Sequence, residues 1–105
     1  MIEHVRDVDF DSFIGRQGIA IVEFWAEWCP LCKQMESVLQ RLDDTYASKV
    51  RIAKVNVEHE QATAETYGVQ SLPTLLIFRE GTLIGRVTGF VPYEALDEAL
   101  ANLPD

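Results

Sequence analysis

Cysteine and histidine are scarce in this sequence, with two of each among its 105 residues. Both cysteines stand in one tetrapeptide, Cys29-Pro30-Leu31-Cys32, which excludes a framework of several disulfides. A zinc ion normally takes four ligands, and His4 and His59 lie far apart in the chain. We therefore expect no metal held within one chain, and a cluster shared by two chains through the tetrapeptide is the remaining metal-binding alternative.

Long apolar runs and clusters of basic residues are also missing. No window approaches the ~20 apolar residues that a membrane span needs, and the 9 Lys and Arg residues are scattered among 17 acids. We accordingly expect neither a membrane anchor nor nucleic-acid binding. Residues 1–7 include acids and lack the apolar stretch of a signal peptide, which favours a cytoplasmic location.

The formal net charge of −8 has two interpretations. The acids form an ordinary solvated surface, or they favour partners that carry a positive docking patch. The content of 48% hydrophobic and 25% charged residues is typical of a folded globular protein. Together with the length and the lack of repeats or linkers, this composition predicts a single domain over residues 1–105.

The hydrophobic pattern changes its period several times along the chain. A nearly continuous apolar run at 19–25 is typical of a strand covered on both faces, and from Pro30 to about Ala47 apolar residues recur at helical spacing. Asp9 is a candidate N-cap for a short helix that Gly15 or Gly18 ends. The expected strands are 2–5, 19–25, 50–57, 74–78 and 82–88, and the expected helices are 10–14, 30–47, 58–67 and a terminal one from Pro92 to Leu103.

The resulting order of elements is β-α-β-α-β-α-β-β-α, with the last two strands joined by a tight turn at Glu80-Gly81. Two βαβ crossovers followed by a hairpin predict an α/β fold, in which a mixed sheet carries helices on both faces.

Several separated segments resemble the thioredoxin family, in the right order and spacing. They are Phe24-Trp25-Ala26-Glu27-Trp28-Cys29 with Lys33 behind it, Ala53-Lys54-Val55-Asn56-Val57, Tyr67-Gly68-Val69, Leu72-Pro73-Thr74-Leu75, Glu80-Gly81 and Gly89. The resemblance implies a thioredoxin fold, a mixed five-stranded sheet flanked by four helices. It also implies a disulfide between Cys29 and Cys32 at the N-terminus of the second helix.

The sequence departs from the family pattern at three places. Pro30-Leu31 stands where the family usually has Gly-Pro, Glu23 where it usually has Asp, and Ser37 where a helix-kinking proline is common. The first departure bears on the redox potential and on the fit of partners. The third predicts a straighter helix.

The tetrapeptide suits thiol–disulfide exchange, in which a thiolate and not a thiol attacks. Unpaired N–H groups and the dipole at a helix start stabilise such an anion at Cys29. Pro30 fits the first helical position but offers no N–H, which leaves Leu31 and Cys32 as donors. We assign Cys29 as the nucleophile and Cys32 as the resolving thiol. The alternative is a static disulfide, which a loop this short would stabilise little.

Glu23 is an acid among apolar neighbours of the strand at 19–25. A buried carboxylate is costly, so we expect it to be protonated, paired or hydrated. Its functional interpretation is a proton acceptor and donor for Cys32, with its charge modulated by Lys54, which the resemblance places in the neighbouring strand. In the alternative interpretation, Glu23 points into solvent and Lys54 is its weak surface partner.

Pro73 begins an otherwise apolar strand, which argues for an edge, a bulge or a cis bond. The resemblance implies a cis peptide at Leu72-Pro73, packed against the cysteines, with the backbone of Leu72 pairing with an extended substrate. Gly89 either permits close approach of a partner backbone or serves as a turn glycine.

Three residues around the cysteines are expected to form an apolar docking surface for substrates, namely Trp28, Pro30 and Leu31. The alternatives are that Trp28 belongs to the core and that Leu31 is an ordinary surface leucine. Trp25 is expected to pack near the start of the helix.

The resemblance implies a thiol–disulfide oxidoreductase that reduces protein disulfides. The sequence has no glycine motif for a nucleotide, so we expect no cofactor of its own and a separate reductase of the thioredoxin-reductase type that recharges it. An open active face favours a monomer. Two alternatives stay open: a binding or scaffold subunit whose cysteines are incidental, and an oxidase or isomerase of disulfides.

Overall fold

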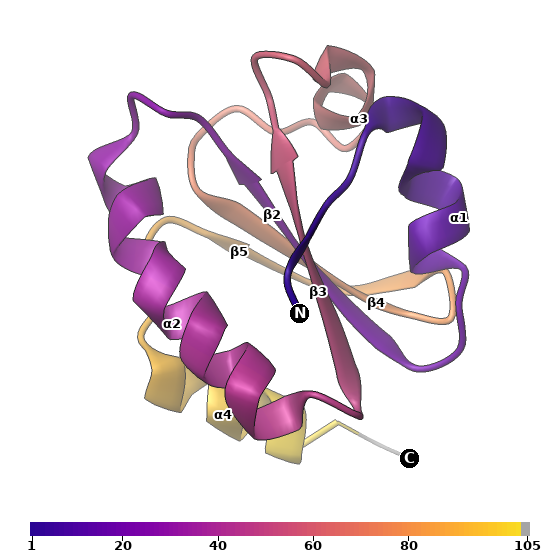
Figure 1. Cartoon of the computed structure of the whole chain (residues 1–105), viewed down its shortest axis with the longest axis vertical. Coiled ribbons are helices and arrows are strands. Elements are labelled where there is room, and N and C mark those ends of the chain that lie inside the picture. The colour runs from indigo at the N-terminus through magenta and orange to yellow at the C-terminus, as the bar shows by residue number, and fades with distance from the viewer. Residues whose placement is uncertain (104–105) are drawn as a thin grey trace.

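A mixed sheet with helices on both faces forms the framework of the protein, as Figure 1 shows. The computed structural model describes residues 1–103, so the end of the expected domain, 104–105, lies outside it. The elements are β1 (Glu3–His4), the short 3-10 helix η1 (Asp7–Asp9), α1 (Phe10–Ile14), β2 (Ile19–Trp25), α2 (Pro30–Tyr46), β3 (Val50–Asn56), α3 (Gln61–Thr66), β4 (Thr74–Arg79), β5 (Thr82–Thr88) and α4 (Tyr93–Ala101).

The five strands lie in the order β1-β3-β2-β4-β5. The first three strands of the chain are mutually parallel where they pair, because helices return the chain to the same edge. β4 runs antiparallel to β2, and β5 runs antiparallel to β4. The expected α/β fold, a mixed five-stranded sheet flanked by four helices, is confirmed.

Two apolar cores lie on opposite faces of the sheet. On one face, Phe10, Phe13 and Ala64 from α1 and α3 pack against the sheet. On the other face, Met35, Leu39 and Leu42 of α2 and Leu96 of α4 do the same. The apolar run of β2 follows from this arrangement, since its alternate residues enter different cores.

This alternation places Glu23 on the same face as Ile21, beneath α2. The strand register then forms a row of neighbours across the sheet. His4 lies beside Lys54, Lys54 beside Glu23, and Glu23 beside Leu75. The register therefore brings one base and one acid together under the helix that begins at the tetrapeptide.

Two helices, α3 and α4, have other bounds than expected. α3 begins at Gln61 and not at Glu58, because Asn56 holds a turn in front of it: its side-chain oxygen accepts from the Glu58 N–H at 2.9 Å. α4 begins at Tyr93, with Pro92 as the cap, and ends at Ala101, so Leu103 lies beyond the helix. The turn at Glu80-Gly81 has φ angles of 49° and 87°, as its strand pair requires.

Asp9 was expected to cap α1 through its side chain, and this side-chain role is wrong. Asp9 stands at the cap position but makes no side-chain cap hydrogen bond. Its carboxylate instead accepts from Arg6 Nε at 3.0 Å. Among the helices of residues 1–103, none combines the length and the apolar character of a membrane span.

Candidate redox site

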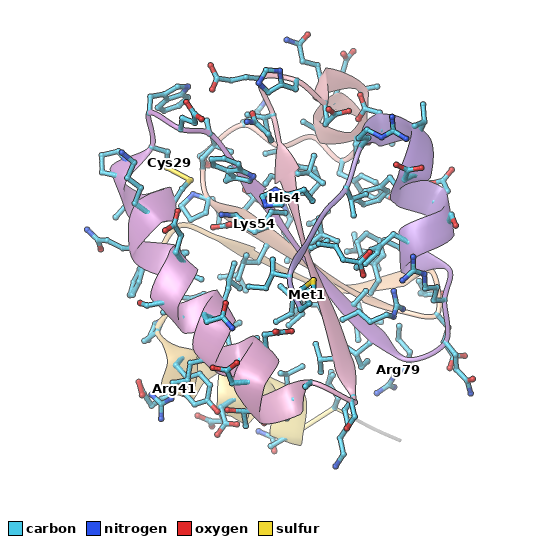
Figure 2. All side chains as sticks on the ribbon, in the orientation of Figure 1. Met1, His4, Cys29, Arg41, Lys54 and Arg79 are labelled. Carbon is cyan, nitrogen blue, oxygen red and sulfur yellow. A yellow bond between two sulfur atoms is a disulfide. The ribbon has the colours of Figure 1, made fainter. Side chains whose placement is uncertain are left out.

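The two cysteines form a disulfide at the start of α2, with their Cα atoms 5.3 Å apart. Figure 2 shows this sulfur–sulfur bond at the first turn of the helix. Cys29 is the N-cap and Pro30 the first helical residue. In the disulfide state both cysteines are buried, with 4% of Cys29 and 2% of Cys32 exposed. The two cysteines therefore differ little in exposure in this state.

The helix start supplies a hydrogen-bond donor to the outer sulfur. The backbone N–H of Cys32 donates to Sγ of Cys29 at 3.2 Å. It is one of the two donors expected from the sequence, and the same N–H points at the atom that would carry the thiolate charge.

Exposed apolar side chains surround the disulfide. Trp28 is 67% exposed and Leu31 41% exposed, and Pro30 is exposed too. The interpretation of Trp28 as a core residue is therefore wrong. A hollow of about 240 Å³ opens beside the tryptophan, and its lining residues are Trp28, Val57, Val69, Gln70, Ser71 and Leu72.

Phe90 is a further exposed apolar residue, 42% exposed, that the sequence analysis missed. Its neighbours tie it to the site: the Gly89 N–H donates to the Pro73 carbonyl at 2.7 Å, and the Val91 N–H donates to Sδ of Met35 at 3.4 Å. The only signal in the sequence is that a phenylalanine follows Gly89 directly.

The backbone at Leu72–Pro73 has the cis peptide that was expected, and Gly89 nearby is left-handed, with φ of 89°. A Cβ at Gly89 would meet no atom within 4 Å. The left-handed backbone therefore accounts for this glycine without any crowding inside the protein.

Glu23 is fully buried, and neither of its carboxylate oxygens has a hydrogen-bond partner among residues 1–103. The alternative in which it points into solvent is wrong. Burial raises the pKa of Glu23 to about 7, the Lys54 ammonium opposes that rise, and the Glu36 carboxylate adds to it. The side chain therefore changes its charge near neutral pH.

Lys54 lies between two acids. Its Nζ is 4.0 Å from Oε1 of Glu23 and 4.0 Å from Oε1 of Glu36. The same ammonium lies 4.4 Å from the centre of the Trp25 ring, and His4 packs edge-on against that ring at 6.4 Å between centroids. Figure 2 shows His4 and Lys54 next to each other on the sheet. Glu36 was not predicted, because nothing in the sequence shows that α2 brings it to β3.

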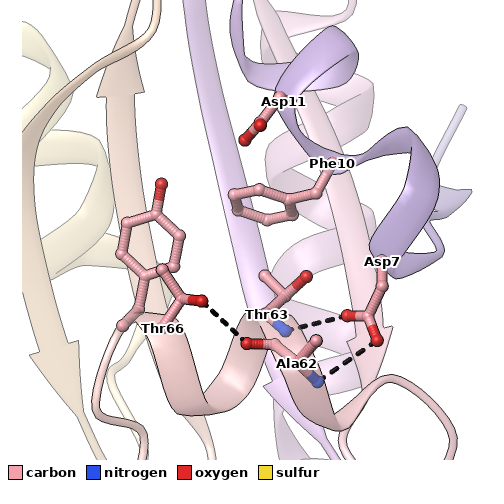
Figure 3. A pocket seen from close by; sticks show the side chains of 7 residues that line it. Asp7, Phe10, Asp11, Ala62, Thr63 and Thr66 are labelled. Atoms are coloured by element: carbon pink, nitrogen blue, oxygen red, sulfur yellow. Dashed lines mark hydrogen bonds between the residues drawn. The ribbon is translucent and has the colours of Figure 1, made fainter.

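A second hollow, of about 200 Å³, lies between η1, α1 and α3 (Figure 3). Asp7 spans it and accepts from the N–H groups of Thr63 at 2.9 Å and Ala62 at 3.2 Å. Burial acts to raise the pKa of Asp7, but these hydrogen bonds outweigh it and the pKa is lowered. The Asp7 carboxylate is thus engaged as a cap of α3, and we do not interpret this hollow as a second reactive site.

Within residues 1–103, no three His, Cys, Asp or Glu side chains are grouped closely enough to hold a metal ion. The reactive groups that the structure does bring together are the cysteine pair at one end of α2 and a cluster of Glu23 and Lys54 from the sheet with Glu36 from the same helix. A disulfide at the start of α2 and a buried carboxyl with a pKa of about 7 on the sheet face that α2 covers together suit thiol–disulfide exchange.

Comparison with known proteins agrees with this chemistry. The family profile described as Thioredoxin matches residues 1–102. Proteins named thioredoxin from the Staphylococcus aureus strains Mu50, MW2 and N315 are each 42% identical over 99 residues, which cover 94% of this chain and 94% of theirs.

Proposed function

The chain belongs to the thioredoxin family of thiol–disulfide oxidoreductases, and we propose that within it Cys29 attacks protein disulfides and Cys32 resolves the product. The observation that carries this assignment is the position of Cys29 at the N-cap of α2, where its sulfur accepts the Cys32 N–H at 3.2 Å. A charge on Cys29 is stabilised there, whereas Cys32 already belongs to the first turn of the helix.

The proposed reaction passes two electrons in two displacements. The Cys29 thiolate attacks one sulfur of the substrate disulfide, the substrate S–S bond breaks, and the first substrate thiolate leaves and takes up a proton. Cys32 then gives up its proton, its sulfur attacks Sγ of Cys29, and the second substrate thiolate leaves. The protein ends as the Cys29–Cys32 disulfide, and a separate reductase returns both electrons and two protons. A reductase and disulfide substrates are the general partners of this family.

We assign Glu23 as the group that takes the proton from Cys32. Its support is that the buried carboxyl, with a pKa of about 7, exchanges protons at neutral pH. Cys32 belongs to the buried face of α2, together with Met35 and Leu39, and that face covers the side of the sheet that carries Glu23. Lys54 is the charge modulator of this carboxyl, 4.0 Å away.

Substrates are proposed to dock on the apolar rim of the disulfide. Trp28, Pro30 and Leu31 would contribute apolar contacts, and their exposure supports this role. Leu72 lines the adjoining hollow, and it and Pro73, which follows it in the chain, would present backbone to an extended substrate. Gly89, hydrogen-bonded to Pro73, would complete the surface.

The wider setting is part of the same proposal. The protein acts as a monomer in the cytoplasm, as a single domain over residues 1–105, without metal or cofactor of its own, on protein disulfides and not on nucleic acid. The net charge of −8 and the scattered basic residues support the last point. A reductase of the thioredoxin-reductase type would recharge it.

Reduction of insulin disulfides by the wild type, Cys29→Ser and Cys32→Ser tests the assignment. Both variants should lose turnover, and only Cys32→Ser should accumulate a mixed disulfide with the substrate through Cys29. A mixed disulfide in Cys29→Ser instead would reverse the roles. If the wild type binds a partner stably but shows no turnover with any reductant, the protein is a binding or scaffold subunit.

Equilibration against defined glutathione and dithiothreitol buffers tests the direction of electron flow. A potential well below that of disulfide oxidases, which lie near about −120 mV, is expected for a reductase. A potential near or above about −150 mV would point to oxidation of disulfides instead of reduction.

A further inference from the structure

Glu36 occupies a position from which it competes for Lys54, the only cation paired with the buried acid among residues 1–103. It lies one turn beyond Cys32 on α2, and its side chain is 61% exposed. Lys54 Nζ is equally distant, at 4.0 Å, from one oxygen of Glu36 and one oxygen of Glu23. A direct charge-assisted hydrogen bond would measure about 2.8 Å. Lys54 therefore completes a close ion pair with neither acid.

We propose that Glu36 is a positioning residue for thiol–disulfide exchange, which holds Lys54 back from a full ion pair with Glu23 and so leaves Glu23 free to exchange protons with Cys32. This inference rests on the proposed role of Glu23. It concerns the control of that carboxyl and adds no new reacting group.

The surroundings of Glu23 explain why one surface acid has this influence. Lys54 has only 12% of its side chain exposed, so water compensates little for a lost partner. The Trp25 ring holds the ammonium from a third side, at 4.4 Å. Both oxygens of Glu23 lack hydrogen-bond partners within residues 1–103, so Lys54 is the main group there that offsets the burial of this carboxyl.

Other titratable or charged groups on the surrounding elements are few. β4 presents the apolar Leu75 beside Glu23, and β1 presents His4 beside Lys54. A hollow of about 390 Å³ next to Trp25 is lined by Ala26, Glu27, Lys33 and Glu36 as well as Trp25 itself. The groups that the test has to consider are thus Lys54, Glu36, His4, Lys33, Glu27 and the two cysteines.

Removal of the Glu36 charge should let Lys54 approach Glu23 and stabilise its ionised form. We expect the titration midpoint of Glu23 to fall by about 0.5 pH unit in Glu36→Gln, the size of a partly exposed charge interaction. The measurement is the side-chain carboxyl carbon signal of Glu23 in NMR spectra of the oxidised protein across pH. Glu36→Asp keeps the charge and should restore the wild-type midpoint at least in part.

Asp44→Asn is the matched control. Asp44 is an exposed acid on the same helix, two turns beyond Glu36, and its carboxylate accepts from Gln40 at 3.0 Å. This substitution removes the same charge without touching Lys54, so the Glu23 midpoint should stay where it is. If the Glu23 midpoint falls equally in Glu36→Gln and Asp44→Asn, the effect comes from the change in net charge alone, and the proposal is overturned.

The Lys54→Met background decides whether Glu36 acts through the ammonium. Methionine keeps an unbranched side chain beside Trp25 but has no charge. If Glu36 acts by holding Lys54, most of the fall caused by Glu36→Gln should disappear in this background. A fall of full size without Lys54 would show direct repulsion between the two acids and would overturn the positioning role.

The rate at which Cys32 resolves a mixed disulfide gives the functional readout. Its pH profile should move to lower pH in Glu36→Gln by the same about 0.5 unit as the Glu23 midpoint. An unmoved profile with a moved midpoint would mean that Glu36 does not act on the reaction. The NMR titration needs no turnover, so a failure of the proposed function leaves the relation between Glu36, Lys54 and Glu23 separately measurable.

Discussion

The backbone N–H of Cys32 donates to Sγ of Cys29 at 3.2 Å, across a turn whose first helical residue is Pro30. Proline removes the donor that any other residue would offer at this position. The family's usual Gly-Pro dipeptide also offers a single N–H, but on its first residue, whereas here the N–H of the dipeptide belongs to Leu31.

Pro30→Ala restores the N–H at residue 30 and keeps a good helix former at the position. We expect the Cys29 thiolate of the reduced protein to form at lower pH in this variant, because a further donor and the helix dipole then act on the anion. The ultraviolet absorbance of the thiolate across pH measures the change. Leu31→Ala leaves the backbone donors intact and should not move the titration. An unchanged titration in Pro30→Ala would mean that the restored N–H does not reach the sulfur.

Glu23→Gln should alter the pH dependence of stability. The folded protein holds the Glu23 proton up to about pH 7, whereas the ordinary value for glutamate is 4.5. A raised folded pKa gives stability that is complete below 4.5 and is lost as the pH rises through about 7. Glutamine cannot ionise, so above about pH 8 the variant should be more stable by about 3 kcal/mol, with little difference in acid.

Urea unfolding of the oxidised protein across pH measures this effect. Lys54→Met provides the opposite control, because it removes the cation that opposes the rise in the Glu23 pKa. Its stability should go on falling above about pH 7, where that of the wild type levels off. Parallel curves for wild type and Glu23→Gln would show that the carboxyl ionises without cost in the folded state.

The parts of the fold that the sequence predicted well are those with a strong local pattern. The apolar run of β2, the helical period after Pro30 and the turn at Glu80-Gly81 each depend on neighbouring residues, and all three lie where expected. The cysteine pair belongs to the same class, since its spacing and its place between strand and helix are visible in one segment.

Contacts between distant segments account for most of what was missed. Asn56 holds a turn ahead of α3, so this helix begins later than expected. Asp7, near the N-terminus, caps α3 at Thr63, from which it is separated by 56 residues. The relation of Glu36 to Lys54 likewise exists only because α2 lies over β3. Burial of Glu23 needed the structure too, since the sequence alone left an exposed alternative open.

Gly89→Ala separates the cost of a left-handed backbone from a role in substrate contact. Gly89 has φ of 89°, and Gly81 in the β4–β5 turn has φ of 87°. A Cβ would meet nothing within 4 Å at Gly89 and only ordinary contact, 3.8 Å from Gly15, at Gly81. Alanine at either place should therefore cost about 1 kcal/mol of stability through strain alone.

Only Gly89→Ala should also raise the KM for a protein disulfide, by several-fold, because its added methyl group faces the proposed docking surface. Urea unfolding and insulin reduction kinetics, measured on both alanine variants, provide the two readouts. Equal stability losses with unchanged KM in both would leave Gly89 as a turn glycine and remove it from the substrate surface.

Asp7 stabilises α3 through a cap that comes from outside the helix. Its carboxylate accepts the Thr63 and Ala62 N–H groups, and its own N–H donates to Oε1 of Glu60 at 2.9 Å. Glu60, at the cap position itself, makes no side-chain cap hydrogen bond, so Asp7→Ala should lower the free energy of unfolding by about 1 kcal/mol.

The lowered pKa of Asp7 adds a pH signature to this substitution. Its contribution is present above the ordinary value of 3.8 and is lost as the pH falls through the lower folded value, so the difference between wild type and Asp7→Ala should shrink in strong acid. Asp9→Ala is the matched control, because in the part of the chain that the structure describes Asp9 pairs only with exposed Arg6, at 3.0 Å, and its loss should cost less than about 0.5 kcal/mol. Equal losses from the two alanine variants at neutral pH would mean that the cap across the hollow contributes no more than a surface ion pair.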